Sequence, residues 1–289
     1  MTVALGAHVR ANGIRQHYLH FAGAGPRVVI VPGIVSPAAL WSHVGEWLCA
    51  THDCFVLDVR GRGLSESGPH LDYGFDACAQ DLIEFVRTMA LGPVIVVGHS
   101  MGARIALRAA KAAPEVFDSL VLLDPPTSGP GRRPYPIPKS RTLQMLRAAH
   151  RADAPAQAHA SAAVAAAAPA PTQASAPQPW PEALQRVRAE WLPTCDERAL
   201  HVAYDDFHGQ DPFADLAGTS MPVSLIAAGT GGVISDADID EMRRARTDLR
   251  AVRLDGVGHQ MQAENFAAFS RALAEVLRNH GSKAGRGVL

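Results

Sequence analysis

Short apolar segments alternate with helical patterns along most of this sequence, and this alternation restricts the fold more than any other feature. The segments are brief, rich in Val, Ile and Leu, and bounded by Gly, Pro or Asp, which is typical of strands. Because they are almost continuously apolar, they predict a parallel sheet that is covered on both faces. The strand candidates are Val28–Val31, Cys54–Asp58, Val94–Val97, Leu120–Leu123, Ser224–Ala228 and Arg250–Leu254.

Helical patterns lie between these strands, and a hairpin is expected before the first of them. Asn12-Gly13 separates two segments around Val9 and Tyr18, which predicts an antiparallel hairpin at the edge of the sheet. The whole pattern predicts an α/β fold with a mostly parallel, doubly wound sheet. The helix candidates are Pro37–Cys49, Tyr73–Ala90, Gly102–Ala113, Ala237–Arg246 and Ala263–His280.

The alternation stops between about Pro125 and Thr219 and then resumes. We expect residues 1–125 and 219–289 to form the core, and residues 126–218 to form an inserted helical cap over the strand ends. Within the cap, Ala152–Pro179 consists almost entirely of Ala, Pro, Gln and Ser, and its prolines interrupt an otherwise favourable alanine helix. This stretch is expected to form short, poorly packed helices and no catalytic element.

Charge and composition argue against several classes of partner. The 289 residues have a formal net charge of −1 and no basic block, so neither nucleic acid nor a membrane surface is expected as partner. The N-terminal stretch does not read as a signal peptide, and no window approaches the roughly 18 apolar residues that span a bilayer. The four cysteines form neither a C-x-x-C pair nor a zinc-spaced cluster. We therefore expect a soluble, cytoplasmic protein without metal, cofactor or obligate protein partner.

The strongest chemical signal is G-x-S-x-G at Gly98–Gly102. This motif is common by chance, but here it follows a predicted strand and precedes a helical pattern, the context in which it carries a nucleophile. Ser100 is the expected nucleophile, on a sharp turn at a helix N-terminus. The expected oxyanion donors are the backbone N–H groups of Met101 and of Ile34, in the loop after the first parallel strand.

A serine hydroxyl needs a base to remove its proton, and the base in such sheets is a histidine after the last strand. Of the 13 histidines, only His259 follows the last predicted strand within a turn. His259 is therefore the expected base. His99, beside the nucleophile, is expected to pack or to shape the pocket.

The acid that orients the base has two candidate positions. The more common one follows the strand Ser224–Ala228, but Gly232 occupies it here. Asp236 and Asp238 come later and resemble an N-cap and a first-turn charge of a helix. Asp124 directly follows the strand Leu120–Leu123, at the edge where α/β sheets place their active sites. Asp124 is the favoured acid, with Asp236, Asp238 or no acid as alternatives.

These residues resemble those of the α/β-hydrolase superfamily and, within it, the N-formylmaleamate deformylases of aerobic nicotinic acid breakdown. The closer resemblance covers most of the chain. It lies in Ala11–Tyr18, Leu57–Ser65, Val97–Arg104, Asp124–Pro126, Ser128–Arg133, Arg188–Leu192, Asp205–His208, Gly231–Ile234 and Gly258-His259.

The resemblance implies an α/β-hydrolase fold, with Ser100, Asp124 and His259 as the triad, which agrees with the choice made from the residues alone. It implies hydrolysis of an N-formyl amide without a metal. Carboxylesterases, lactonases and C–C hydrolases share such a triad and remain alternatives, as does a binding module without activity.

The implied substrate is a small amide that carries a carboxylate, and a buried carboxylate needs a cation or several hydrogen-bond donors. Substrate-binding candidates in the cap are Arg133, Tyr135, Trp191 and His208, together with His99 beside the nucleophile.

Overall fold

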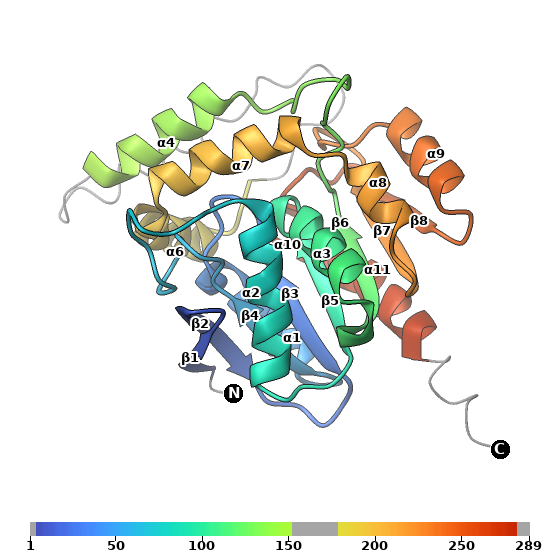
Figure 1. Ribbon diagram of the computed structural model, residues 1–289, viewed down its shortest axis with the longest axis horizontal. Helices are drawn as coiled ribbons and strands as arrows, with labels where there is room; N and C mark the ends of the chain where they lie inside the picture. The colour runs from blue at the N-terminus through green and yellow to red at the C-terminus, as the bar shows by residue number, and fades with distance from the viewer. Residues whose placement is uncertain (1–3, 152–178, 282–289) are drawn as a thin grey trace.

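The computed structural model describes residues 4–151 and 179–281 and shows one twisted sheet with helices on both faces (Figure 1). Eight strands lie in the order β1-β2-β4-β3-β5-β6-β7-β8, and all neighbours from β4 to β8 are parallel. The strands are β1 (Leu5–Ala11), β2 (Ile14–Phe21), β3 (Arg27–Val31), β4 (Asp53–Leu57), β5 (Val94–His99), β6 (Phe117–Leu123), β7 (Val223–Ala228) and β8 (Arg250–Leu254).

The predicted hairpin is present at one edge of the sheet. β1 and β2 pair antiparallel through the turn at Asn12 and Gly13, whose φ angles are 48° and 76°. Positive φ at both positions is the geometry that the Asn-Gly pair favours. β2 continues the sheet by pairing antiparallel with β4.

The predicted doubly wound architecture is confirmed. Along β3, Val29 and Val31 pack into one apolar core, and Val28 and Ile30 pack into a second core on the opposite face. α2 and α3 cover the first core, and α1 and α11 cover the second. A strand with apolar neighbours on both faces has no polar alternation, which explains its continuous apolar run.

The helices follow the predicted patterns with small differences. They are α1 (Ser42–Leu48), α2 (Phe75–Thr88), α3 (Met101–Ala112), α4 (Lys139–Arg151), α6 (Glu182–Trp191), α7 (Glu197–Gly209), α8 (Pro212–Ala217), α9 (Asp236–Ala245), α10 (Met261–Glu264) and α11 (Phe266–Gly281). Three short 3-10 helices are η1 (Ala38–Trp41), η2 (Pro114–Val116) and η3 (Leu192–Thr194). None of the helices within residues 4–151 and 179–281 is long and apolar enough to cross a membrane.

The prediction of one continuous helix over Ala263–His280 was wrong. The chain breaks at Asn265 between α10 and α11, where φ is −148°. The Asn265 side chain accepts a hydrogen bond from the Ala268 N–H at 3.0 Å, so it caps the start of α11.

The segment between β6 and β7, for which a cap is predicted, contains α4, α6, α7 and α8. α4 and α7 pack together and lie with α6 across the carboxyl ends of the strands (Figure 1). α8 instead packs against α3 and α9, in the layer of the core helices. The expectation for Ala152–Pro179 falls, apart from Pro179, outside the described residues.

A buried ion pair fixes the turn that follows β4. Two nitrogens of Arg60 donate to the carboxylate of Asp81 on α2, both at 2.5 Å, and both side chains are almost inaccessible. A third nitrogen of Arg60 donates to the Asp72 carbonyl. This bidentate pair holds the turn against α2, and the same turn carries Arg62 toward the candidate active site.

Replacement of Asp81 by Asn should lower the free energy of unfolding by about 3–5 kcal/mol, because it leaves the buried Arg60 charge uncompensated. Glu84→Gln, one turn further along α2, is the matched control. Glu84 pairs with the exposed Arg87 at 3.0 Å, and loss of such a surface pair should cost less than about 1 kcal/mol. Urea unfolding measures both values. Equal losses would contradict the role given to the buried pair.

Candidate active site

The sharp turn between β5 and α3 carries Ser100. Its φ of 52° and ψ of −117° are rare for a residue with a Cβ atom. The neighbouring strand holds this strained conformation, because the Ser100 N–H donates to the Leu123 carbonyl of β6 at 2.9 Å. The turn thus places the serine hydroxyl at the N-terminus of α3.

Close packing requires glycine next to this turn. A Cβ atom at Gly102 would overlap the carbonyl oxygen of Val31 in β3. α3 can therefore lie this close to the sheet only with glycine at that position, as expected from the motif.

His259 lies in the turn between β8 and α10, and its ring joins the other two expected residues. Nε2 is 3.1 Å from Ser100 Oγ, and Nδ1 is 2.6 Å from Asp124 Oδ2. A carboxylate only accepts hydrogen bonds, so the proton of a neutral ring lies on Nδ1 and the lone pair of Nε2 faces the serine. This is the arrangement in which a histidine takes a proton from a serine hydroxyl.

Two other side chains hold the backbone around His259. The carboxylate of Glu264 accepts from the N–H of Gly258 at 2.7 Å and from that of Gln260 at 3.1 Å. His99 lies 2.9 Å from the His259 carbonyl through Nε2. The histidine is therefore anchored on both sides of its own position. Nothing in the sequence pattern singled out Glu264.

Asp124 directly follows β6 and is fully buried. Its φ is +43°, and like Ser100 it belongs to the four residues other than glycine that have a positive φ within residues 4–151 and 179–281. Its Oδ1 accepts from the Ala228 N–H at 3.2 Å, and its Oδ2 accepts from the Val233 N–H at 2.9 Å as well as from His259. Three donors thus stabilise a carboxylate that has no access to water.

Gly232 lies against this carboxylate. A Cβ atom at Gly232 would be 2.9 Å and 3.1 Å from the two carboxylate oxygens of Asp124. The position where the more common acid is expected has therefore no side chain, and the carboxylate from the neighbouring strand fills the adjacent space. The Asp124 carboxylate and a side chain at residue 232 would occupy the same space, so Asp124 in this position requires glycine at residue 232.

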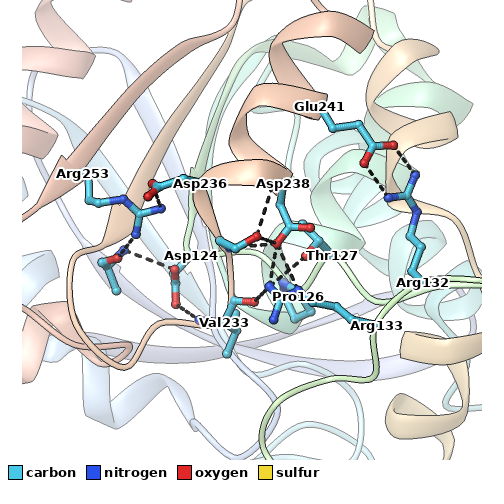
Figure 2. A network of polar contacts seen from close by, with 12 residues as sticks. Asp124, Pro126, Thr127, Arg132, Arg133, Val233, Asp236, Asp238, Glu241 and Arg253 are labelled. Carbon is cyan, nitrogen blue, oxygen red and sulfur yellow. Dashed lines mark hydrogen bonds and ion pairs between the residues drawn. The ribbon is translucent and has the colours of Figure 1, made fainter. Parts of the chain in front are cut away.

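Two arginines brace the segments that donate to Asp124 (Figure 2). Arg253 donates to the Ala228 carbonyl and pairs with Asp236 at 2.8 Å. Arg133 donates to the Val233 carbonyl at 2.6 Å and pairs with Asp238 at 2.6 Å.

The two alternative acids therefore lie apart from the His259 ring. Asp236 pairs with Arg253, and Asp238 forms a capping box with Ser235 at the start of α9. The N-cap of this helix is Ser235 and not an aspartate, which corrects the expectation. The His259–carboxylate contact is made by Asp124.

The two expected oxyanion donors share a buried neighbour, Arg62. Met101 is the first residue of α3, so its N–H has no partner within the helix. Arg62 donates through Nε to the Ile34 carbonyl at 3.1 Å and contacts Met101 Sδ at 3.4 Å. It also donates to the Ala199 carbonyl of α7 at 3.2 Å. Arg62 therefore ties the loop of Ile34, the serine turn and the cap together, a role the sequence did not reveal.

Tyr135 is the substrate-binding candidate that lies next to the nucleophile. Its side chain is buried, and its hydroxyl is near enough to Ser100 for the serine to act on the pKa of the phenol. Burial raises the pKa of the Tyr135 phenol far above its usual value, so the phenol is a neutral donor. Its ring packs against Tyr204 and Phe207 of α7.

His99 is fully buried and packs near Trp41 and His259. Burial, and secondarily the neighbouring His259, lowers the pKa of His99 to about 3, so the ring is neutral. Since a carbonyl only accepts, the His99 proton lies on Nε2 and points to the His259 backbone. The His99 ring therefore contacts the loop that carries His259.

The remaining candidates lie further out in the cap. His208 is exposed, with Nδ1 donating to the Tyr204 carbonyl at 2.7 Å and Nε2 accepting from the Tyr135 N–H at 3.4 Å. Trp191 is half-buried at the end of α6. A cavity of about 370 Å³ opens beside the two tyrosines. It is lined by Pro134, Tyr135, Ile137, Pro138, Lys139, Tyr204, Asp205 and His208. Within residues 4–151 and 179–281, no group of three His, Cys, Asp or Glu side chains is arranged to hold a metal ion.

Comparisons with known proteins agree with this fold. The profile of the alpha/beta hydrolase family matches residues 28–278. The chain is 42% identical over 276 residues to N-formylmaleamate deformylase of Pseudomonas putida KT2440, covering 96% of this chain and 97% of that protein. A segment of 102 residues is 35% identical to 2-(acetamidomethylene)succinate hydrolase of Mesorhizobium japonicum, covering 35% of this chain and 36% of that one.

A solved structure gives the same result. The crystal structure of the N-formylmaleamic acid deformylase Nfo of Pseudomonas putida S16 superposes with a TM-score of 0.84 at 40% identity. The match covers 93% of this chain and 100% of that one.

Asp124→Asn should lower kcat by about 10²- to 10⁴-fold, because an amide favours the wrong tautomer of the imidazole. Asp236→Asn and Asp238→Asn are the matched controls, and each should cost less than about tenfold, as expected for residues paired at a helix terminus. Steady-state hydrolysis of an activated ester measures all three. A larger loss in either control than in Asp124→Asn would show that the acid has been misassigned.

Proposed function

The chain belongs to the alpha/beta hydrolase family, and from that premise we propose that it is a serine hydrolase that cleaves N-formylmaleamate to maleamate and formate. The observation that carries the choice of substrate is the 42% identity to N-formylmaleamate deformylase, which extends over 96% of this chain. The contacts of His259 with Ser100 and Asp124 support the chemistry.

In the first half of the proposed reaction, Ser100 Oγ attacks the formyl carbon and gives its proton to His259 Nε2. Asp124 accepts the hydrogen bond from Nδ1 and stabilises the imidazolium that forms. The short contact of 2.6 Å and the buried carboxylate suit this role, because the ring keeps one orientation while its charge changes.

The negative charge that develops on the formyl oxygen needs donors already in position. We assign this role to the N–H groups of Met101 and Ile34. Arg62 supports the assignment, because its contacts with the Ile34 carbonyl and the Met101 thioether leave these two residues little freedom to move apart.

The C–N bond then breaks, and the departing nitrogen takes the proton from His259. That nitrogen is also acylated by the maleate carbonyl, so it leaves more easily than the nitrogen of an ordinary amide. In the second half, His259 takes a proton from water as the water oxygen attacks the formyl carbon of the formyl-serine. The bond from this carbon to Ser100 Oγ then breaks, His259 returns the proton to Oγ, and formic acid leaves and ionises to formate. A triad without a metal accounts for every step.

Tyr135 is the best placed of the proposed substrate-binding residues. Its neutral phenol lies beside Ser100 and has a proton to donate to an oxygen of the bound amide. Arg133 and His99 take part indirectly in this proposal, through Val233 and through the loop of His259. We propose no direct contact with the substrate for His208 and Trp191, which lie further out in the cap.

We further propose that the reaction takes place in the cytoplasm. The four cysteines form no disulfide bond with one another, and burial raises the pKa of the Cys78 and Cys195 thiols to about 12. Thiols of this kind are compatible with a reducing compartment.

Wild-type protein should release formate from N-formylmaleamate, and EDTA should not stop it, because no step needs a metal. Ser100→Ala should lower kcat by roughly 10⁴-fold or more, while circular dichroism shows an unchanged fold. Formate is measured with a coupled formate dehydrogenase assay.

An ester panel separates this proposal from an esterase of the same fold. If simple aryl esters are hydrolysed orders of magnitude faster in kcat/KM than N-formylmaleamate, the substrate assignment fails and the carboxylesterase alternative is preferred. Activity that EDTA removes and zinc restores would overturn the metal-free mechanism.

A further inference from the structure

One arginine of the cap differs from the others in its partners. Arg188 on α6 contacts Met145 Sδ at 2.9 Å and lies over the ring of Trp180, with its guanidinium carbon 4.7 Å from the ring centre. Within residues 4–151 and 179–281, neither a carboxylate nor any other oxygen accepts a hydrogen bond from its side chain. Four other cap arginines form ion pairs: Arg132 with Glu241, Arg133 with Asp238, Arg147 with Glu197 and Arg186 with Glu182.

Two buried arginines also lack an ion pair, but they are not comparable with the partly accessible Arg188. Arg62 donates to three carbonyls, and Arg104 donates to the carbonyls of Pro126, Ser128 and Gln210. These oxygens replace the water that burial removes. Among the described residues, the five N–H donors of Arg188 have only the Met145 thioether as a hydrogen-bond partner, with the Trp180 ring over the guanidinium, so its desolvation is poorly compensated.

Arg188 points into the protein rather than outward. It lies one turn before Leu192, which is fully buried, so the two share a face of the helical segment. Burial lowers the pKa of the Arg188 guanidinium to about 10. The residue nevertheless keeps part of its surface accessible. The guanidinium is therefore partly desolvated and still accessible to a solute.

The position of α6 places this helix near the loop of Ile34. α6 packs against η1, the 3-10 helix shortly after the loop of Ile34. The helix that carries Arg188 therefore covers the segment next to one of the two proposed oxyanion donors. On the other side, Met145 belongs to α4, which packs against α7.

The alternative cation for this role is already engaged. Arg133 pairs with Asp238 and donates to the Val233 carbonyl, both at 2.6 Å. Moving its guanidinium to a substrate would release the segment whose N–H holds Asp124. Lys139, at the described cavity, pairs with Asp205 at 3.0 Å. Unlike Arg133 and Lys139, Arg188 can bind an anion without breaking an ion pair of the described chain.

We propose that Arg188 binds the carboxylate of the substrate through paired, charge-assisted hydrogen bonds and so selects short amides that end in a carboxylate. The planar guanidinium matches a carboxylate with two parallel N–H groups. Trp180 stacks on its face and Met145 contacts one nitrogen, so the fork is oriented before the anion arrives. This inference rests on the proposed function for the identity of the amide.

The test compares N-formylmaleamate with its methyl ester, which lacks the charge, in two variants. Arg188→Met should lower the ratio of kcat/KM for the acid to that for the ester by about 10- to 100-fold, the range expected for a charged hydrogen-bonded contact. The loss should appear in KM more than in kcat. Arg186→Met is the matched control on the same helix, since Arg186 is exposed and pairs with Glu182; its ratio should not change. Arg188→Lys, which keeps the charge without the fork, should lie between Arg188→Met and the wild type.

A second measurement does not need the deformylase activity. Maleate, which carries the same kind of carboxylate, should inhibit hydrolysis of the neutral ester p-nitrophenyl acetate by the wild type. In Arg188→Met its inhibition constant should rise about tenfold or more. Failure of the wild type to release formate, with this Arg188-dependent inhibition intact, would reject the proposed substrate and keep the carboxylate site. An unchanged substrate ratio and unchanged maleate inhibition in Arg188→Met would overturn the inference.

Discussion

The hydrogen bond between the buried Asp124 carboxylate and His259 is the contact on which the rest of the site depends. It joins the loop after β6 to the turn after β8, while the two N–H groups that hold the same carboxylate come from the end of β7 and the loop after it. Ser100 then needs only the strained turn after β5 to reach the other ring nitrogen. Four adjacent strands thus converge at one edge of the sheet, and Arg133, Arg253 and Glu264 stabilise the segments between them.

Local patterns in the sequence predicted much of this arrangement. The apolar runs correctly located the six parallel strands, because helices on both faces leave all of them except the edge strand β8 largely buried. The glycines around Ser100 mark a turn whose packing excludes larger residues. Gly232 also pointed to Asp124 as the acid, because glycine has no carboxylate at the position where the acid is more commonly found. In the structure, a Cβ atom at residue 232 would be in contact with the Asp124 oxygens.

Other features depend on contacts that no local pattern encodes. Arg62 reaches Ala199, 137 residues away in the sequence, and Arg188 reaches Met145, 43 residues away. In the sequence such charged residues resemble ordinary surface positions, and only the packing of the cap on the core reveals which of them are buried and which lack a partner. The break at Asn265 was missed for a similar reason, since a single capping side chain is a weak signal within a helical pattern.

The central claim is that Ser100 is a nucleophile activated by His259 and oriented by Asp124. Labelling with a fluorophosphonate followed by peptide mass spectrometry tests it most directly, because the reagent reports activated serines without any assumption about the substrate. The account predicts one adduct on the wild type, located at Ser100, and labelling that is slowed by orders of magnitude in His259→Ala. An adduct on a different serine, or labelling at Ser100 that is equally fast without His259, would contradict it.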